Sequence, residues 1–387
     1  MSTSLVIVTS LYPPGAGGAE MHSQRLAVCM IRGGNEVAVI TLCPKTGQKG
    51  RWTRDPLGVP LRLVRNLGEG RARDLYFALA TMWLLLTCCR RYDAIHWTMT
   101  GLHATLGLPL AHWLGIRNVV MFAASGDLPR LRQSLPGLFF LWGMRRWVRR
   151  IIVLNQQMME EVQQAGLPAS RAVIFPCEID SDVYTPPDPD LKADLRRELR
   201  FASDDAIIIF VGRFVLEKCL PQLVAAFAQT RRDWSNAQLV LVGDGPLMPG
   251  VRKQIAELGL ESYIRLPGFL DSESVRDYLQ AADIFALVSS SEGIPCALIE
   301  AMAVGLPSVV TAIPAMTQVV DNEVHGLRIE PGHPELIAAA LNQLLRDPDR
   351  RVSMGLRARD LVRARYTMNV MAWRYDAFFR ELREERA

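Results

Sequence analysis

Short apolar runs alternate with longer helix-forming stretches along the first half of the chain. Runs of this length that are rich in Val and Ile are typical of buried strands. The pattern predicts strands at 5–9, 36–42, 94–97, 118–122, 151–154 and 172–175, and helices at 21–31, 75–90, 104–114 and up to 166. Strands that are apolar along their whole length and separated by helices indicate a parallel sheet covered on both faces.

A proline-dense segment at 184–190 separates this half from a second one with the same alternation. Proline suppresses both helix and strand, so the segment is interpreted as a linker. Beyond it the pattern predicts strands at 206–211, 238–242, 263–266, 284–287 and 308–311, with helices between them, and an amphipathic helix over 360–385. The sequence therefore predicts two α/β domains, 1–183 and 184–367.

Composition narrows the class of protein. A chain of 387 residues is long enough for two domains, and its net charge of +4 implies no nucleic acid or other polyelectrolyte partner. Its seven cysteines are scattered, without a Cys-x-x-Cys pair, which favours reduced thiols in the cytoplasm. The start lacks a basic leader, so no signal peptide is expected. The apolar stretch 75–89 is too short to span a bilayer and is interpreted as a buried helix.

Two carboxylates, Glu292 and Glu300, form the most informative local pattern. Glu292 lies in a Gly/Pro loop after an apolar run, and Glu300 lies among helix formers before Gly305-Leu-Pro307. This predicts a strand, a loop and a helix, with Glu292 at the carboxyl edge of a parallel sheet and Glu300 about two turns into the helix. Open α/β sheets bind ligands at that edge. Two acceptor-only groups there suit a ligand rich in hydroxyls, such as a sugar or a ribose.

A glycine-rich loop, Tyr12-Pro-Pro-Gly-Ala-Gly-Gly-Ala-Glu20, follows the first predicted strand. Glycine permits close backbone approach, and a helix start offers N–H groups to an anion. The dinucleotide fingerprint Gly-x-Gly-x-x-Gly would need glycine where Glu20 stands, and no acidic residue closes the second strand. A nicotinamide cofactor is therefore disfavoured, while a purely structural turn stays an alternative.

These segments together resemble the retaining family 4 glycosyltransferases. The spacing Glu292-x7-Glu300 matches the family's paired glutamates, and the loop 12–20 matches its amino-terminal glycine loop. Val211-Gly-Arg-Phe-Val-Leu-Glu-Lys218 resembles its phosphate signature, and Val240-Leu-Val-Gly-Asp-Gly-Pro246 resembles the next strand and turn. The motifs follow the family's order over nearly the whole chain.

The resemblance implies the GT-B fold, in which two Rossmann-like domains with parallel sheets face each other across a cleft. The first domain, 1–183, would take the acceptor, and a C-terminal helix at about 368–387 would pack back on it. The second, 184–367, would bind the nucleotide sugar. No cofactor is implied.

The resemblance also implies that Arg213 and Lys218 act on the diphosphate of the donor. Arginine supplies a fork of donors and lysine a point charge. Negative charge grows on the diphosphate as the glycosidic bond breaks, so preorganised cations there stabilise the transition state. They would replace the divalent metal that other transferases use. Cys219 stands where the family often has glycine, which leaves both charges in place.

Other donor contacts follow from the same resemblance. Glu292 would accept hydrogen bonds from the donor sugar and Glu300 from the ribose, and the nucleobase would rest near Gly268-Phe269-Leu270. The remaining residues expected at the donor are Gly17, Gly18, Gly293, Ile294 and Pro295, the last of which has no N–H to offer.

Three Asp-x-Asp triplets, at 180–182, 188–190 and 347–349, raise the alternative of a metal site. Two of them contain proline and are interpreted as turns. The first reads Cys177-Glu-Ile-Asp180 where the family has Asn-Gly-Val-Asp, so contacts from this loop are in doubt. No metal site is expected.

The first domain departs most from the family pattern. Family members carry a His-Gly pair after the strand that corresponds to 118–122, and Ser125 stands in the place of that histidine. Serine forms hydrogen bonds but cannot shuttle protons near neutral pH. Asp127 or His96, which ends its predicted strand, is a candidate for that role, a structural role for His96 being the alternative. These three residues are the expected acceptor-side groups.

The segment 130–150 mixes arginines with bulky apolar residues. Such a segment is a candidate for contact with an anionic membrane at its cytoplasmic face. An ordinary amphipathic helix with a solvated basic face is the favoured alternative.

The expected function is transfer of a glycosyl unit, of the hexosyl type, from a nucleotide-diphosphate sugar to an acceptor hydroxyl on a glycan, a lipid-linked acceptor or a small molecule. The transfer would retain configuration and need no metal. The alternatives are a sugar-nucleotide-binding protein without catalysis, suggested by Ser125, and, less favoured, a nicotinamide-dependent oxidoreductase. The sequence does not indicate the sugar, the base or the acceptor.

Overall fold

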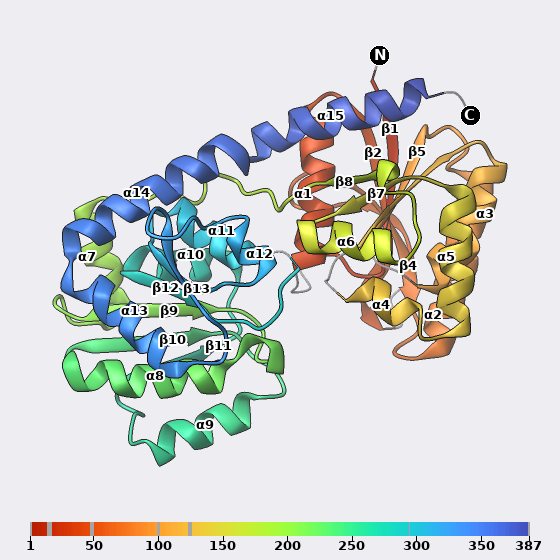
Figure 1. Cartoon of the computed structure of the whole chain (residues 1–387). Helices are drawn as coiled ribbons and strands as arrows, with labels where there is room; N and C mark the ends of the chain where they lie inside the picture. Colours follow the sequence, from red (N-terminus) through yellow and green to blue (C-terminus); the bar gives the residue numbers. More distant parts are fainter. Residues whose placement is uncertain are drawn as a thin grey trace. The chain divides into compact units, whose positions relative to one another are not determined.

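The computed structural model describes residues 2–13, 18–46, 50–98, 101–122, 126–293 and 295–385, and for residues 18–20 it describes the backbone. The chain divides into two compact units (Figure 1). Unit 1 is Met1–Glu178 with Met368–Ala387, and unit 2 is Ile179–Thr367. None of the helices in the described part of the chain has the length and apolar character needed to cross a membrane.

Unit 1 contains an eight-stranded sheet in the order β3-β4-β2-β1-β5-β6-β7-β8. Its strands are β1 (Ser4–Val8), β2 (Glu36–Thr46), β3 (Trp52–Arg54), β4 (Pro60–Asn66), β5 (Ala94–Thr98), β6 (Arg117–Met121), β7 (Val148–Val153) and β8 (Ala172–Ile174). All neighbours pair in parallel except β3 and β4. The antiparallel pair has no counterpart in the predicted elements, because polar residues interrupt both strands and the pair lies at the sheet edge.

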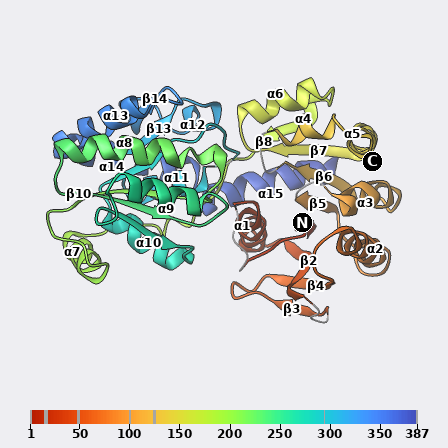
Figure 2. The same cartoon turned by 90° about the horizontal axis from the view of Figure 1, so that it is seen from below.

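Helices cover both faces of this sheet (Figures 1 and 2). They are α1 (Gly18–Arg32), α2 (Arg71–Thr87), α3 (Leu102–Trp113), α4 (Asp127–Leu131), α5 (Leu135–Trp147), α6 (Gln156–Gln164) and α15 (Met368–Glu384). The C-terminal α15 packs on α1, and its Tyr375 ring stacks on Phe175 at a centroid distance of 4.4 Å. On the other face, α3 packs between α2 and α5.

Unit 2 contains a six-stranded parallel sheet in the order β11-β10-β9-β12-β13-β14. Its strands are β9 (Ala206–Val211), β10 (Ala237–Val242), β11 (Ile264–Gly268), β12 (Ile284–Leu287), β13 (Ser308–Thr311) and β14 (Gly326–Ile329). Its helices are α7 (Pro189–Glu198), α8 (Leu220–Asp233), α9 (Met248–Glu257), α10 (Ser272–Ala281), α11 (Cys296–Ala303), α12 (Pro314–Thr317), α13 (Pro334–Arg346) and α14 (Pro348–Arg365).

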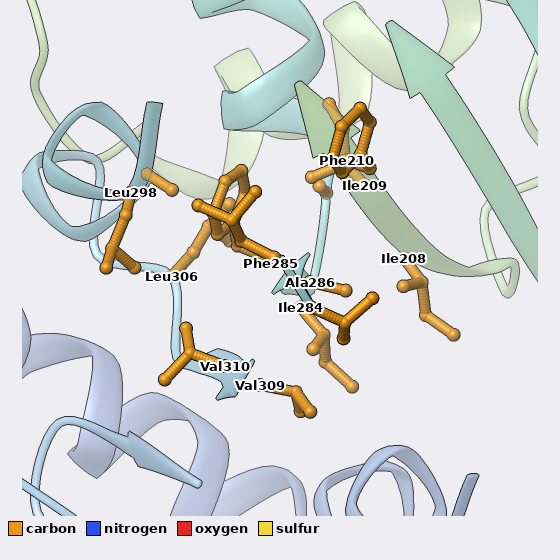
Figure 3. Packing of buried hydrophobic residues seen from close by; sticks show 14 of the residues in the cluster. Ile208, Ile209, Phe210, Ile284, Phe285, Ala286, Leu298, Leu306, Val309 and Val310 are labelled. Carbon is orange, nitrogen blue, oxygen red and sulfur yellow. The ribbon is translucent and has the colours of Figure 1, made fainter. Parts of the chain in front are cut away.

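The core of unit 2 lies where β9, β12 and β13 meet α11. Figure 3 shows side chains of these strands lying together with Leu298 and Leu306. Phe210 and Phe285, on the neighbouring strands β9 and β12, are fully buried. Burial of side chains this large stabilises the sheet by about 1.5–3 kcal/mol each, and this holds the two strand ends in fixed positions.

Candidate functional site

The strand order of unit 2 reverses between β9 and β12. From β9 the chain continues to β10 and β11 on one side, and from β12 it continues to β13 and β14 on the other. The loops that leave these two strands at their carboxyl ends therefore diverge and leave a crevice, where ligands of open α/β sheets bind. The loops are 212–218 after β9 and 288–293 after β12. They carry Arg213, Lys218 and Glu292.

Lys218 and Glu292 form an ion pair across these two loops. The Lys218 Nζ donates to Glu292 Oε1 at 2.5 Å, and Ser289 Oγ donates to the same oxygen at 2.6 Å. The Glu292 side chain is 6% exposed and that of Lys218 is 19% exposed. A backbone bond from Ser290 N to Glu217 O, 2.8 Å, ties the loops together. Three protein contacts therefore hold the carboxylate and the ammonium in one place.

This pairing leaves the ammonium able to bind an anion. A lysine ammonium has three donors, and in the described part of the chain the bond to Glu292 uses one of them. The lysine closes the turn Leu216–Lys218, and Cys219 follows it in the left-handed region with φ 53°. That conformation favours glycine, the residue that the family pattern has at this position. Cys219 therefore adopts the glycine's backbone conformation and keeps the turn.

Arg213 is exposed between Gly212 and the buried Phe214. Its guanidinium makes no hydrogen bond or ion pair with the residues that the structure describes. The backbone beside it is held firmly, because Phe214 N donates to Asp244 O at 2.9 Å and Gly212 N donates to Val242 O at 3.0 Å. A loop held by backbone hydrogen bonds thus presents an exposed fork of five donors next to the strand edge, which is the arrangement that phosphate recognition uses.

The turn after β10 packs directly against this loop. Gly243 has φ 135°, and a Cβ built there would lie 1.9 Å from Gly212 O. Gly245 has φ 157°, and its Cβ would lie 2.6 Å from Phe214 O. Only glycine allows the two backbones to approach this closely. The segment 240–246 therefore supports the loop that carries Arg213.

We expect Gly243→Ala to lower the midpoint of thermal unfolding by several degrees. The left-handed strain costs about 1–2 kcal/mol, and the contact with Gly212 O adds to it. The control is Gly250→Ala in α9, where no atom lies within 4 Å of the built Cβ. That variant should unfold at or slightly above the wild-type temperature. Equal midpoints for both variants, measured by circular dichroism, would contradict this account.

The second glutamate lies on α11, in the strand, loop and helix predicted for this region. Glu300 is half-buried and sits just over one turn into the helix, because the helix begins at Cys296 directly after the buried Pro295. The prediction of about two turns is therefore corrected. Gly293 is half-buried, and Ile294 lies outside the described residues.

The expected nucleobase segment follows β11 at the same carboxyl edge. Gly268 ends this strand with φ 81°, and its carbonyl accepts from Gly243 N at 2.9 Å. The Phe269 ring is exposed and Leu270 is half-buried. An exposed aromatic ring on an anchored turn suits stacking on a base. Contact of Phe269 and Leu270 with the nucleobase therefore stays a prediction.

In unit 1 the strand order reverses between β1 and β5. The glycine loop follows β1, and Gly17 lies outside the described residues, while the backbone of Gly18 begins α1. Tyr12, at the loop's start, donates to Asp55 Oδ2 at 2.9 Å, and Gln24 Nε2 donates to the same oxygen at 2.8 Å. Burial, together with the Asp55 charge, raises the pKa of Tyr12 well above its ordinary value. Sequence reasoning missed this tether, because its partner is 43 residues away.

His96 does not end its strand, contrary to the prediction. β5 continues to Thr98, and His96 is fully buried in register with Ile7 and Val119. Its Nδ1 lies 3.1 Å from Thr98 Oγ1. Burial, with a smaller effect of His22, lowers the pKa of His96 to about 3, so the ring is neutral at physiological pH. These contacts favour the structural alternative.

Asp127 begins α4 just after β6 and is half-buried. Ser125 lies outside the described residues. The preceding Gly126, with φ 88°, donates its N–H to both carboxylate oxygens of Glu161 at 2.9 and 3.0 Å. Burial raises the pKa of Glu161, the Gly126 bond opposes this, and the Asp127 charge adds to it. Glu161 was not among the predicted residues, because no local signal connects it to a loop 35 residues away.

The departure at 177–180 has a structural explanation. Glu178 is fully buried, and its Oε2 lies 3.2 Å from His22 Nδ1. Arg25 Nη1 donates to the Glu178 backbone oxygen at 2.7 Å. The Glu178 carboxylate therefore lies beside His22 in the interior of unit 1.

Two of the three Asp-x-Asp triplets are helix caps. Asp188 accepts from Leu191 N at 2.8 Å at the start of α7, and Asp347 accepts from Arg350 N at 2.9 Å at the start of α14. Asp180 Oδ1 accepts from Asp182 N at 3.1 Å. Within the described residues, no group of three or more His, Cys, Asp or Glu side chains is placed to hold a metal ion.

Known proteins resemble this chain over most of its length. The model for Glycosyltransferase Family 4 matches residues 16–183, and that for glycosyl transferases group 1 matches residues 192–361. An alpha-D-kanosaminyltransferase of Streptomyces kanamyceticus is 26% identical over 62% of this chain and 63% of its own length. A D-inositol 3-phosphate glycosyltransferase of Kineococcus radiotolerans is 29% identical over 91% of this chain and 88% of its own.

A similar solved structure is that of HepE from Anabaena, in complex with UDP and glucose. It aligns with a TM-score of 0.82 and 18% identity, and covers 98% of this chain and 99% of its own. This likeness shows the fold. The two family matches, the two parallel α/β units and the order of the motifs agree, and the chain therefore belongs to glycosyltransferase family 4 and has the GT-B fold.

Proposed function

We propose that this chain transfers a glycosyl unit from a nucleoside-diphosphate sugar to an acceptor hydroxyl, with retention of configuration and without a metal ion. The observation that carries the proposal is the Lys218–Glu292 ion pair at the strand-order reversal of unit 2, beside the exposed Arg213. Lys218 and the exposed guanidinium of Arg213 offer positive charge to the diphosphate of such a donor. The carboxylate of Glu292 offers acceptors to the hydroxyls of its sugar.

The leaving group would be bound by the cations. Arg213 and the remaining donors of Lys218 bind the diphosphate, which gains negative charge as the bond from the anomeric carbon to its oxygen breaks. Glu292 accepts hydrogen bonds from the sugar hydroxyls, and Glu300 from the ribose. Because the pair fixes Glu292 relative to Lys218, the sugar and the phosphate are positioned by one rigid unit.

The acceptor oxygen forms the new bond to the anomeric carbon on the same face, and its proton passes to the departing phosphate oxygen. In this account no side chain forms a covalent intermediate. Residues 1–183, with 368–387, would bind the acceptor, and residues 184–367 the donor. Ser125 and Asp127 stay the proposed acceptor-side groups, and the buried His96 is proposed to have a structural role. Gly17, Gly18, Gly293, Ile294, Pro295, Phe269 and Leu270 stay the proposed donor contacts.

The test is release of nucleoside diphosphate with and without acceptor. A thermal-shift screen of nucleotide sugars, beginning with UDP sugars because HepE was solved with UDP, identifies the donor, since a ligand of the native state raises its stability. Acceptor-dependent release should follow, with the donor's anomeric configuration kept in the product. Donor binding without any release would favour the binding-protein alternative.

We expect turnover to survive excess chelator, because Arg213 and Lys218 neutralise the diphosphate. The same release assay is run after dialysis against chelator and again with added magnesium or manganese. Loss of activity on chelation that either metal restores would overturn metal independence. It would favour the alternative in which Asp180 and Asp182 hold a metal ion.

A further inference from the structure

Helix α2 is apolar on both sides. Its inner side packs on the sheet through Phe77, Leu84 and Leu85, as expected for the stretch 75–89. Its outer side carries Leu75, Leu79, Trp83 and Leu86, which recur every three or four residues and are all exposed. The prediction of a buried helix was therefore wrong for half of its circumference. A surface helix normally places polar residues on that side.

The two neighbouring helices continue this apolar surface. α3 packs against both α2 and α5, and the three lie side by side on one face of the unit 1 sheet (Figures 1 and 2). On α5 the exposed side is apolar rather than basic, with arginines in the last turn. The exposed large apolar residues of the three helices, here called the α2–α3–α5 face, are Leu75, Tyr76, Leu79, Trp83, Leu86, Leu102, Trp113, Leu135, Leu138, Phe139 and Trp142.

This concentration is unusual for a surface without a partner. Single exposed apolar side chains are common, but contiguous apolar patches mark interaction sites. In the rest of the described chain no helix carries more than two exposed large apolar residues. The α2–α3–α5 face therefore calls for an apolar occupant.

The charged residues near this face indicate what kind of partner it binds. The segments 71–87, 102–113 and 127–147 contain six arginines and two aspartates. Arg73 pairs with Asp74, and Arg132 and Arg145 donate to backbone oxygens at the end of α6. The exposed arginines offered to a partner are therefore Arg71, Arg130 and Arg146. A partner must therefore be apolar in its body and negative at its surface. An anionic lipid bilayer has both properties, and each arginine near it contributes about 1 kcal/mol.

The aromatic residues fit the same occupant. Trp83 and Trp113 are 67% and 77% exposed, and Tyr76 and Trp142 are also exposed. Tryptophan and tyrosine combine an apolar ring with a polar donor, and they concentrate at the boundary between lipid headgroups and acyl chains.

We propose that the α2–α3–α5 face of unit 1 rests on the surface of an anionic lipid bilayer, with its apolar side chains at the headgroup boundary and its arginines on lipid phosphates. The contact goes beyond the proposed transfer reaction, and neither the apolar residues of the face nor the exposed arginines are proposed to act in that reaction. It extends the segment 130–150 singled out in the sequence to two further helices.

Vesicle co-sedimentation tests this proposal without any sugar donor, so its failure would leave the transfer reaction untouched. The full chain should sediment with vesicles of phosphatidylcholine and phosphatidylglycerol, less with phosphatidylcholine alone, and less at high salt. Trp83→Ser with Trp113→Ser should weaken binding about tenfold or more, because two exposed indoles no longer enter the bilayer. The matched control is Trp373→Ser on α15, which is 73% exposed and should bind as wild type.

A second test replaces two exposed arginines, Arg130→Gln with Arg146→Gln. This variant should bind the mixed vesicles about 30-fold more weakly, and its binding should depend less on salt. Arg252→Gln with Arg363→Gln, exposed arginines of unit 2, is the control and should change nothing. Circular dichroism confirms that each variant folds.

Three outcomes would overturn the proposal. One is that the wild-type chain fails to bind mixed vesicles. Another is that the control variants lose binding as much as the test variants do. The third is a wild-type dimer in sedimentation velocity that Trp83→Ser with Trp113→Ser converts to monomer, because the face would then join two copies of the chain.

Discussion

Replacing Lys218 by alanine should lower turnover at saturating donor by about 100-fold or more, which is the scale of losing one preorganised donor to a developing anion. Arg213→Ala should have an effect of the same order. The two variants should differ in stability, however. Arg213 is exposed and has no partner in the described structure, whereas Lys218 is the ion-pair partner of the buried Glu292. Lys218→Ala should therefore lower the free energy of unfolding by about 1–3 kcal/mol, and Arg213→Ala should not.

A double variant separates the two roles of the lysine. Lys218→Ala with Glu292→Gln also removes the buried negative charge that lost its lysine partner, so stability should recover while turnover stays low. Arg252→Ala, an exposed arginine on α9, controls for loss of a surface charge and should keep normal turnover. Near-normal turnover of Arg213→Ala or Lys218→Ala at saturating donor would show that the residue does not stabilise the leaving group.

Glu300→Gln and Glu292→Gln should have different effects on ligand binding and on turnover. A ribose contact exists in the nucleotide sugar and in the free nucleoside diphosphate alike, so Glu300→Gln should weaken both by about 1–3 kcal/mol. Glu292→Gln should spare the free diphosphate, which has no sugar. Glu292→Gln should instead lower turnover, because the sugar ring changes shape and charge during transfer.

Calorimetric titration of both ligands against both variants decides this division. The ion pair sharpens the expectation for Glu292→Gln: the amide oxygen can still accept from Lys218, but the negative charge that offsets the ammonium is gone, so free diphosphate should bind as well as to wild type or more tightly. If Glu292→Gln weakens the free diphosphate as much as Glu300→Gln does, the assignment of sugar to one and ribose to the other is wrong.

Much of the architecture was predictable because buried parallel strands have a strong local signature. The strands β9 to β13 were expected within one or two residues, since most of their positions are apolar and buried. The placement of Arg213, Lys218 and Glu292 after such runs was enough to put them at strand ends. Three strands were not predicted: β3 and β4 form an edge hairpin with polar positions, and β14 reads Gly-Leu-Arg-Ile, which has no continuous apolar run.

The order of strands in a sheet cannot be predicted from any one segment of the sequence. The Lys218–Glu292 ion pair and the burial of His96 both depend on that order. Because β9 and β12 are neighbours, Lys218 bonds Glu292 across 74 positions. Because β5 lies between β1 and β6 and runs to Thr98, His96 is interior rather than terminal.

Helix α2 shows the same division between sequence and tertiary structure. The apolar residues of 75–89 were sufficient to predict a helix, yet a helix that is apolar all round carries no sign of which side packs. The sequence by itself determined the elements and the chemistry at their ends, because these depend on neighbouring residues. Tertiary structure alone decided which charges pair and which apolar side faces outward, because those depend on residues brought together from distant positions.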